Sequence, residues 1–336
     1  MKQDLQAWLA ALLVASLTGI GWAQEQPEGE QPAADGQVTI TLPDGSVYEG
    51  QFDGVIFNGT GTLRWEDGYV YRGEFLDGKK HGQGVSEFPD GSRYEGEFRN
   101  DRFHGQGTFS FEDGYVYEGE FDNGTRQGQG KLTAPGGDIY EGEFQDDQFH
   151  GEGVFSFSNG DRYEGEFQDG KFHGQGTFTF QNGQVYQGEF RDGVMAGQGS
   201  LTTASGDTYD GEFEDGKFHG QGTFTFQNGQ VYQGEFRQGA ISGTGTLTAP
   251  SGDVYQGEFR QGKFHGQGVY EFTNGDRYEG EFQDGVMAGQ GTLMSANGDR
   301  YEGQFSNNTF NGEGVYLYQD GERLEGNFED GEFAGS

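Results

Sequence analysis

The chain has 336 residues and a formal net charge of −36, from 56 Asp and Glu against 20 Lys and Arg. It has no Cys, which excludes disulfides, thiolate catalysis and cysteine-ligated zinc, and its acidity argues against nucleic acid as a partner, because phosphate binding needs clustered Lys and Arg. Aromatic residues make up 15% and its 66 Gly recur periodically, so the low apolar content does not indicate disorder.

The N-terminus has the layout of an export signal. Lys2 precedes an apolar run, Ala7–Ala23, in which Gly21 and Ala23 are small residues placed for cleavage before Gln24. We predict a signal peptide over 1–23 and a flexible acidic linker over 24–37, and therefore a periplasmic, cell-surface or secreted protein. The run is also close to the shortest length that spans a bilayer, so an uncleaved anchor that tethers the protein to a membrane is the alternative.

The rest of the chain is one internal repeat. Tyr recurs at a constant step of 23 residues, and one further step from the last of these tyrosines reaches Leu324. We predict a continuous array over 38–336, with a half unit at 38–47, twelve full units over 48–323 and a half unit at 324–336. The repeated tyrosines are Tyr48, Tyr71, Tyr94, Tyr117, Tyr140, Tyr163, Tyr186, Tyr209, Tyr232, Tyr255, Tyr278 and Tyr301.

Each unit has the pattern of a β-hairpin. In the unit from Tyr163, the segment Tyr163–Phe167 (YEGEF) alternates as a half-buried strand does, and TFTF at Thr177–Phe180 is predicted as a second strand. The turn Asp169-Gly170 and the loop Phe172–Gly176 (FHGQG) join the two strands. Asn182-Gly183 then predicts a tight turn into the next unit.

The exceptions at the first turn support a conformational requirement there. Where the turn Gly is missing, its position holds Asp101, Asp147 or Asn308. Asn and Asp are the residues other than Gly that best tolerate a left-handed backbone. We therefore expect positive φ angles at these three residues.

The block YEGEF-x-x-G-x-x-HGQG-x-x-x-x-x-NG resembles the MORN repeat (membrane occupation and recognition nexus), over residues 38–335. The resemblance implies an all-β fold: an elongated, single-layer antiparallel meander of tandem 23-residue β-hairpins, with Tyr and Phe along a concave groove. Members of this family include lipid kinases, methyltransferases, membrane-junction proteins and cytoskeletal scaffolds. In the enzymes, the chemistry belongs to an added domain.

From Tyr163 to Tyr301 two kinds of repeat unit alternate strictly, whereas the units from Tyr140 and Tyr163 are both of the aromatic kind. One kind has Phe172–His173 with Phe178 and Phe180, and the other has small or flexible residues such as Met195–Ala196 with Leu201. The alternation is explained by duplication of a two-unit segment and by large-against-small packing. The alternative is that the small units leave recesses between aromatic neighbours that bind a ligand.

Two sets of residues are therefore candidates for binding. The half unit at the C-terminus predicts an unpaired strand edge available for self-association, formed by Leu324, Phe328 and Phe333. The other set lines the predicted groove: Tyr94, Phe98, Tyr117, Tyr140, Phe144, Tyr163, Phe167, Phe178, Phe180, Tyr186, Tyr209, Phe224, Phe226, Tyr232, Tyr255 and Tyr278.

Two rows of polar residues have a structural and a functional interpretation. The histidines lie ten residues after a Tyr, about 10 Å apart by strand spacing, too far apart to share a zinc ion, so a hydrogen-bonding role in the loop is favoured. The carboxylate row keeps the outer face soluble, or else binds divalent cations. The histidines are His81, His104, His150, His173, His219 and His265, and the carboxylates are Glu74, Glu97, Glu120, Glu143, Glu166, Glu189, Glu212, Glu235, Glu258 and Glu281.

Known catalytic motifs do not occur in the sequence, so we predict no catalytic residue, no cofactor and no metal. The preferred hypothesis is a non-enzymatic, exported repeat scaffold for protein–protein interaction or self-association, for example as a dimer through a terminal strand edge. The alternative is a module whose groove binds an envelope polysaccharide or a lipid. Lipid ranks below the others because the charge is unfavourable for anionic headgroups.

Overall fold

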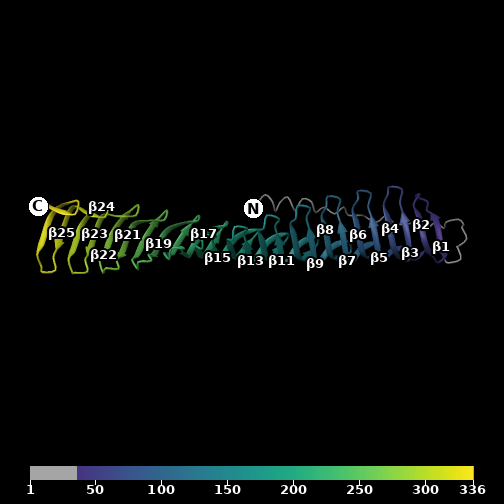
Figure 1. The fold of residues 1–336 in the computed structure, drawn as a ribbon, viewed down its shortest axis with the longest axis horizontal. Helices are drawn as coiled ribbons and strands as arrows, with labels where there is room; N and C mark the ends of the chain where they lie inside the picture. Colours follow the sequence, from purple (N-terminus) through teal and green to yellow (C-terminus); the bar gives the residue numbers. More distant parts are fainter. Residues whose placement is uncertain (1–35, 336) are drawn as a thin grey trace. The chain divides into compact units, whose positions relative to one another are not determined.

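The computed structural model describes residues 36–335, and these residues form β-strands and turns without a helix. The chain divides into two compact units, the first ending at Gln181 and the second beginning at Asn182. Within each unit every strand pairs antiparallel with the next strand in sequence, as the tight two- and three-residue turns require (Figure 1). The predicted all-β, single-layer antiparallel meander is confirmed.

Unit 1 contains strands β1 to β13. Its strands are β1 (Gln37–Thr41), β2 (Val47–Phe52), β3 (Phe57–Arg64), β4 (Val70–Leu76), β5 (Lys79–Glu87), β6 (Arg93–Arg99), β7 (Arg102–Ser110), β8 (Val116–Asp122), β9 (Thr125–Thr133), β10 (Ile139–Gln145), β11 (Gln148–Ser156), β12 (Arg162–Gln168) and β13 (Lys171–Thr179).

Unit 2 contains strands β14 to β27. Its strands are β14 (Val185–Arg191), β15 (Val194–Thr202), β16 (Thr208–Glu214), β17 (Lys217–Thr225), β18 (Val231–Arg237), β19 (Ala240–Thr248), β20 (Val254–Arg260), β21 (Lys263–Glu271), β22 (Arg277–Gln283), β23 (Val286–Met294), β24 (Arg300–Ser306), β25 (Thr309–Leu317), β26 (Arg323–Glu329) and β27 (Glu332–Gly335).

The first turn of the repeat is a two-residue turn with a left-handed backbone. Between β4 and β5, Asp77 and Gly78 have φ angles of 51° and 75°, which is the type I′ geometry that matches the twist of a hairpin. The three residues that replace the turn Gly have the positive φ predicted for them: 69° at Asp101, 67° at Asp147 and 69° at Asn308.

The second turn differs from the predicted Asn-Gly turn. In the sequence-identical turn at Asn228-Gly229, only Gly229 has a positive φ, 87°. The amide of Gly229 donates to the carbonyl of Phe226 at 2.9 Å, and the amide of Phe226 donates to the carbonyl of Gln230 at 2.8 Å. The loop therefore has three residues, of which Asn228 is the second and Gly229 closes the turn in the left-handed region.

The predicted FHGQG loop is wrong, because this segment belongs to a nine-residue strand. In β17, Gly222 pairs with Gly211 and His219 pairs with Glu212, so Gly220 and Gln221 form a bulge in the ladder. Gly220 has a φ of 55°, a left-handed value that glycine adopts at bulges. A second strand limited to TFTF was expected because the glycines interrupt the alternation of apolar residues. The bulge takes up Gly220 and Gln221, so strand pairing continues on both sides of it.

The last two strands differ from the predicted half unit. The segment from Leu324 forms β26, and the short strand β27 pairs with it through Asn327↔Gly335, Phe328↔Phe333 and Glu329↔Glu332. β27 pairs only with Asn327–Glu329 of β26, so it does not pair with the part of β26 that contains Leu324. The predicted signal peptide and most of the predicted linker lie outside the described residues. Within residues 36–335 no helix is long and apolar enough to span a bilayer.

Candidate functional site

The repeated Tyr covers two glycines and sets the two faces of each sheet. In β6, Tyr94 is buried and its hydroxyl donates to the carbonyl of Glu97 at 2.9 Å. A Cβ atom on Gly96 would lie 2.6 Å from this hydroxyl oxygen, so only glycine leaves room for the ring. Tyr and Phe therefore occupy what we call the aromatic face, and the intervening Glu residues occupy the opposite polar face.

Aromatic rings also connect successive repeats. The ring of Tyr94 stacks on Phe103 at 3.9 Å between centroids, and it meets Phe98 and Phe121 edge-on at 5.1 and 5.2 Å. Phe98 belongs to the same strand, whereas Phe121 belongs to the next repeat. Each such pair adds about 0.5–1.5 kcal/mol to the burial of its surface. The face is thus a continuous, interlocked core.

The two kinds of unit differ in the side chain that covers the repeated Tyr. Phe stacks on Tyr in one kind, for example Phe218 on Tyr209 at 3.9 Å. Met195, Ile241 and Met287 occupy the equivalent position in unit 2. The observed alternation agrees with large-against-small packing, and it leaves the recess hypothesis open.

In unit 1 the same position holds a cation in two repeats. The ammonium of Lys80 donates to the hydroxyl of Tyr69 at 2.8 Å. Arg126 is 2% exposed, and its guanidinium lies 5.6 Å from the ring centroids of both Tyr117 and Phe144. Its Nε donates to Asp147 Oδ1 at 3.1 Å, while its Nη1 has no hydrogen-bond partner. Burial lowers the pKa of Arg126, partly offset by the neighbouring Asp147. Neither cation was predicted to be buried, although the signal was present: each replaces an apolar residue of the repeat.

Most of the predicted groove aromatics are core residues. Burial raises the pKa of Tyr209 from 10.0 to about 12, as expected for a phenol in the core. A binding role for these residues stays a prediction. The candidates that reach solvent belong to the second strand of the repeat or to the turn that follows it. Half-buried residues among the candidates are Phe180, Phe224 and Phe226. Buried ones are Tyr94, Phe98, Tyr117, Tyr140, Phe144, Tyr163, Phe167, Phe178, Tyr186, Tyr209, Tyr232, Tyr255 and Tyr278.

The predicted self-association edge contains one exposed apolar side chain. Phe333 in β27 is 40% exposed, whereas Phe328 in β26 is 3% exposed and packs against Tyr301 at 5.0 Å between centroids. Leu324 is half-buried. Of the three candidates, Phe333 is therefore the residue most available to a partner.

The carboxylate row supports the bulge of each repeat. One carboxylate oxygen of Glu74 accepts a hydrogen bond from the backbone amide of Gln83 at 2.9 Å. A Cβ atom on Gly82 would lie 2.5 Å from the carboxyl carbon of Glu74. Divalent-cation binding by this row stays a prediction. The same contact is made by Glu97, Glu120, Glu166, Glu189, Glu212, Glu235, Glu258 and Glu281.

The histidine row contributes its backbone to the same region. The hydroxyl of Tyr209 donates to the carbonyls of Glu212 at 2.9 Å and of His219 at 3.2 Å, which flank the bulge. The carbonyls of His81, His104, His150, His173 and His265 accept the equivalent bond. These bonds use the histidine backbone. The predicted hydrogen-bonding role of the side chain is not seen at Nδ1 of His81 and His265, which is buried without a hydrogen-bond partner.

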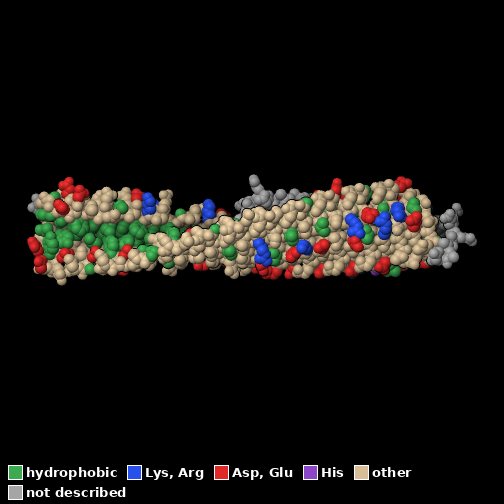
Figure 2. Space-filling view, in the orientation of Figure 1, with side chains coloured by type: hydrophobic (Ala, Val, Ile, Leu, Met, Phe, Trp, Pro, Cys, Tyr) green, Lys and Arg blue, Asp and Glu red, His purple; other side chains and the backbone are tan. Residues whose placement is uncertain are grey.

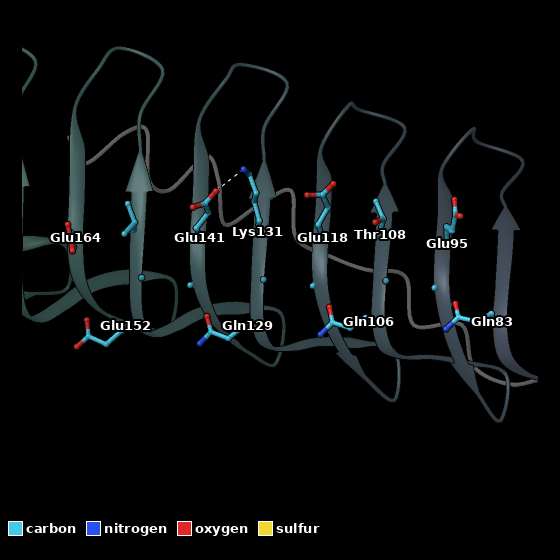
Figure 3. Close-up of a pocket in the computed structure, with 17 residues that line it drawn as sticks. Gln83, Glu95, Gln106, Thr108, Glu118, Gln129, Lys131, Glu141, Glu152 and Glu164 are labelled. Atoms are coloured by element: carbon cyan, nitrogen blue, oxygen red, sulfur yellow. Dashed lines mark ion pairs between the residues drawn. The ribbon is translucent and has the colours of Figure 1, made fainter.

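The polar face of unit 1 contains a trough of about 980 Å³ that sequence reasoning missed. Its floor is glycine backbone, including Gly107, Gly119 and Gly130. Figure 3 shows the two walls: Gln83, Gln106, Gln129 and Glu152 form one row, and Glu95, Thr108, Glu118, Lys131, Glu141 and Glu164 form the other. Lys131 pairs with Glu141 at 2.7 Å. The signal in the sequence is the period-two alternation, because the position between two polar residues directs its side chain to the aromatic face and leaves backbone as the floor.

The chain was compared with known proteins. A curated relative, phosphatidylinositol 4-phosphate 5-kinase 1 of Oryza sativa subsp. japonica, is 42% identical over 48 residues, which are 14% of this chain and 6% of the kinase. The chain thus spans a small part of the length of that relative. The TCP domain of SAS-4 from Drosophila melanogaster, solved with a proline-rich motif of Ana2, is 12% identical with a TM-score of 0.30, covering 56% of this chain and 96% of that domain. Virginiamycin B lyase of Staphylococcus aureus is 12% identical with a TM-score of 0.14, covering 88% of this chain and 95% of the lyase. TM-scores this low do not establish a shared fold.

A family model matches the repeat itself. The model described as MORN repeat matches 48–68, 71–93, 94–114, 117–139, 140–162, 163–185, 186–208, 209–231, 232–254, 255–277, 278–300 and 301–323. These twelve segments begin at the repeated tyrosines and cover most of the chain. The chain therefore belongs to the MORN-repeat family, as a tandem array of twelve repeats.

Proposed function

We propose that this chain is an exported, non-enzymatic scaffold that binds a protein partner on the aromatic face of unit 2. The observation that carries this proposal is the exposed hydrophobic band over β21 to β25, which Figure 2 shows between edges that carry acidic side chains. Contiguous apolar surface of this kind marks an interaction site on a soluble protein. The acidic edges favour a basic partner over an anionic lipid surface.

Along the aromatic face of unit 2, from the turn after β17 to the turn after β21 at the start of this band, large and small side chains alternate. Phe226, Ala249 and Phe272 occupy the same position in three consecutive repeats. The two Phe side chains are half-buried, and the small Ala249 lies in the repeat between them. Phe272 and Phe226 lie four strands apart, or about 19 Å. We infer that the smaller Ala249 leaves a recess between the two aromatic residues, which is the form of pocket that receives an apolar anchor of a partner protein.

Site-specific crosslinking tests this assignment. A photoreactive phenylalanine analogue at Phe226 or Phe272 is expected to give a saturable crosslink to one partner in the native envelope. Ala249→Arg fills the recess and is expected to abolish that crosslink. The matched control is Thr246→Arg, which lies on the polar face of the same strand. Crosslinks that persist in Ala249→Arg, or that arise equally from Thr223 on the polar face, would contradict the proposal.

Self-association is a second candidate function, favoured by the exposed ring of Phe333. An edge strand with free backbone groups can pair with another chain. Sedimentation velocity over a range of concentrations is expected to show a dimer that Phe333→Lys dissociates. A monomer at every concentration would exclude this candidate. Binding of envelope polysaccharide or of anionic liposomes, lost in Phe272→Ser, would instead favour the ligand-binding alternative for the aromatic face.

Export is tested on the mature protein. We expect the N-terminal residue of the purified native protein to be Gln24, read by mass spectrometry of its terminal peptide. An intact N-terminus in a membrane fraction would favour the tethered alternative.

A further inference from the structure

The trough in unit 1 has the dimensions of a site for an extended chain. Its two walls are separated by two residues along each strand, as Gln106 and Thr108 are, or about 7 Å. The glycine floor carries no side chain above it, so backbone is accessible along the whole length between the walls.

The acidic wall has a fixed pitch. Glu95, Glu118, Glu141 and Glu164 occupy the same position of successive repeats and all line the trough. Successive repeats are two strands apart, so these carboxylates recur about every 9.6 Å. A polyproline II helix has three residues per turn and rises about 3.1 Å per residue, so side chains on one side recur about every 9.3 Å. An extended β-strand places them about every 6.8 Å, which does not match.

The charges and hydrogen-bonding groups fit a basic chain in this conformation. The trough is lined by five carboxylates, at the four wall positions and Glu152, against one ammonium, Lys131. Three of the wall carboxylates already pair with exposed cations of this chain: Glu95 with Arg93, Glu141 with Lys131 and Glu164 with Arg162. Pairs as exposed as these contribute at most about 1 kcal/mol, so a ligand cation can replace them.

The opposite wall suits the backbone of such a ligand. Gln83, Gln106 and Gln129 present carboxamides at the same pitch, and a carboxamide both donates and accepts hydrogen bonds. The backbone of a polyproline II helix makes no internal hydrogen bonds and is free to bind them. We propose that the trough of unit 1 binds a basic, proline-rich segment of a partner protein in the polyproline II conformation, with a cation at every third residue.

This site goes beyond the proposed function because it lies on the opposite face and in the other unit. It can be tested with the full mature chain and a fluorescent peptide, (Lys-Pro-Pro)6, by fluorescence anisotropy at low salt. Binding is expected, and the double variant Glu118→Gln/Glu141→Gln should weaken it about tenfold through loss of two ionic contacts. Gln occurs naturally at the equivalent positions 187, 233 and 256, so the variant is expected to fold.

Two controls separate this site from general attraction between opposite charges. Glu302→Gln/Glu325→Gln makes the same change at the equivalent positions of unit 2 and is expected to leave the affinity unchanged. A peptide of identical composition with its lysines grouped at one end is expected to bind at least tenfold more weakly. Equal affinity for the two peptides, or equal effects of the two double variants, would overturn the proposal. So would tighter binding of an uncharged β-1,4-glucan oligomer that Glu118→Gln/Glu141→Gln abolishes. Ala249→Arg, which tests the aromatic face, is expected to leave peptide binding intact.

Discussion

A Cβ atom on Gly107 would lie 2.4 Å from the hydroxyl oxygen of Tyr94, which belongs to the neighbouring strand. The ring of Tyr94 therefore rests directly on the backbone of β7. The hydroxyl is fixed there by its bond to the carbonyl of Glu97. The repeated Tyr and the repeated Gly are thus two parts of one packing unit.

The first prediction follows from this contact. Gly107→Ala forces a methyl group into space that the ring of Tyr94 fills, and overpacking of this kind costs about 1–3 kcal/mol. We expect a lower urea midpoint and faster hydrogen exchange in β6 and β7. Gly136→Ala is the matched control, because a Cβ there has no neighbour within 4 Å and the backbone is not left-handed. Equal stability of the two variants would contradict this account of the glycines.

The second prediction concerns the buried Arg126. Replacing a buried ion pair by apolar residues is often neutral or stabilising by about 1–4 kcal/mol, whereas removing one partner leaves a buried charge and costs about 3–5 kcal/mol. Arg126→Met removes only the deeply buried partner, because the Asp147 side chain is 20% exposed and keeps its hydrogen bond from the backbone amide of residue 126. We therefore expect this variant to preserve or raise the melting temperature, as Met occupies the equivalent position at Met195 and Met287. Asp147→Asn leaves the guanidinium without its anion and is expected to lower the melting temperature. Equal losses in the two variants would contradict this expectation and show that the ion pair itself stabilises unit 1.

The third prediction concerns the turn residues that replace Gly. The carboxylate of Asp101 accepts a hydrogen bond from the amide of Lys80 at 2.9 Å, in the preceding repeat. Asn308 makes the same contact with the amide of Met287 at 2.8 Å. Asp101→Gly relieves the left-handed backbone but loses this bond, worth about 1.5–3 kcal/mol when one partner is charged. We therefore expect Asp101→Gly to be destabilising and Asp101→Asn to be close to neutral in urea denaturation. A stabilised Asp101→Gly would show that backbone strain outweighs the bond.

These residues also show how far the sequence determines the structure. The 23-residue step and the alternation in YEGEF predicted the meander and its faces, since strand periodicity is local. The bond from Lys80 to Asp101 was not predictable, because it joins residues 21 positions apart across two strands. The same holds for the trough: its walls come from separate repeats, and only their register shows that Thr108 and Glu118 lie side by side.

The final prediction concerns acid stability of unit 2. Hydrogen bonds lower the pKa of Asp253, first from the backbone amide of Thr273 and then from the hydroxyl of Ser251. The backbone amides of Gln227 and Gln319 likewise lower the pKa of Asp207 and Asp299. A carboxylate whose pKa is lower in the folded state stabilises the fold above its unfolded pKa, near 3.8, and this contribution is lost as the pH falls through the folded value.

We therefore expect stability to fall below about pH 4. The triple variant with Asn at positions 207, 253 and 299 should be less stable than the parent at pH 7. The difference should shrink as the parent carboxylates become protonated, so the two curves of melting temperature against pH should converge in acid. Parallel curves from pH 7 to pH 2 would show that these carboxylates contribute through their shape rather than their charge. Convergence would identify the Asp at the second turn as the acid-sensitive link between successive repeats, because each of the three bonds crosses from one repeat to the next.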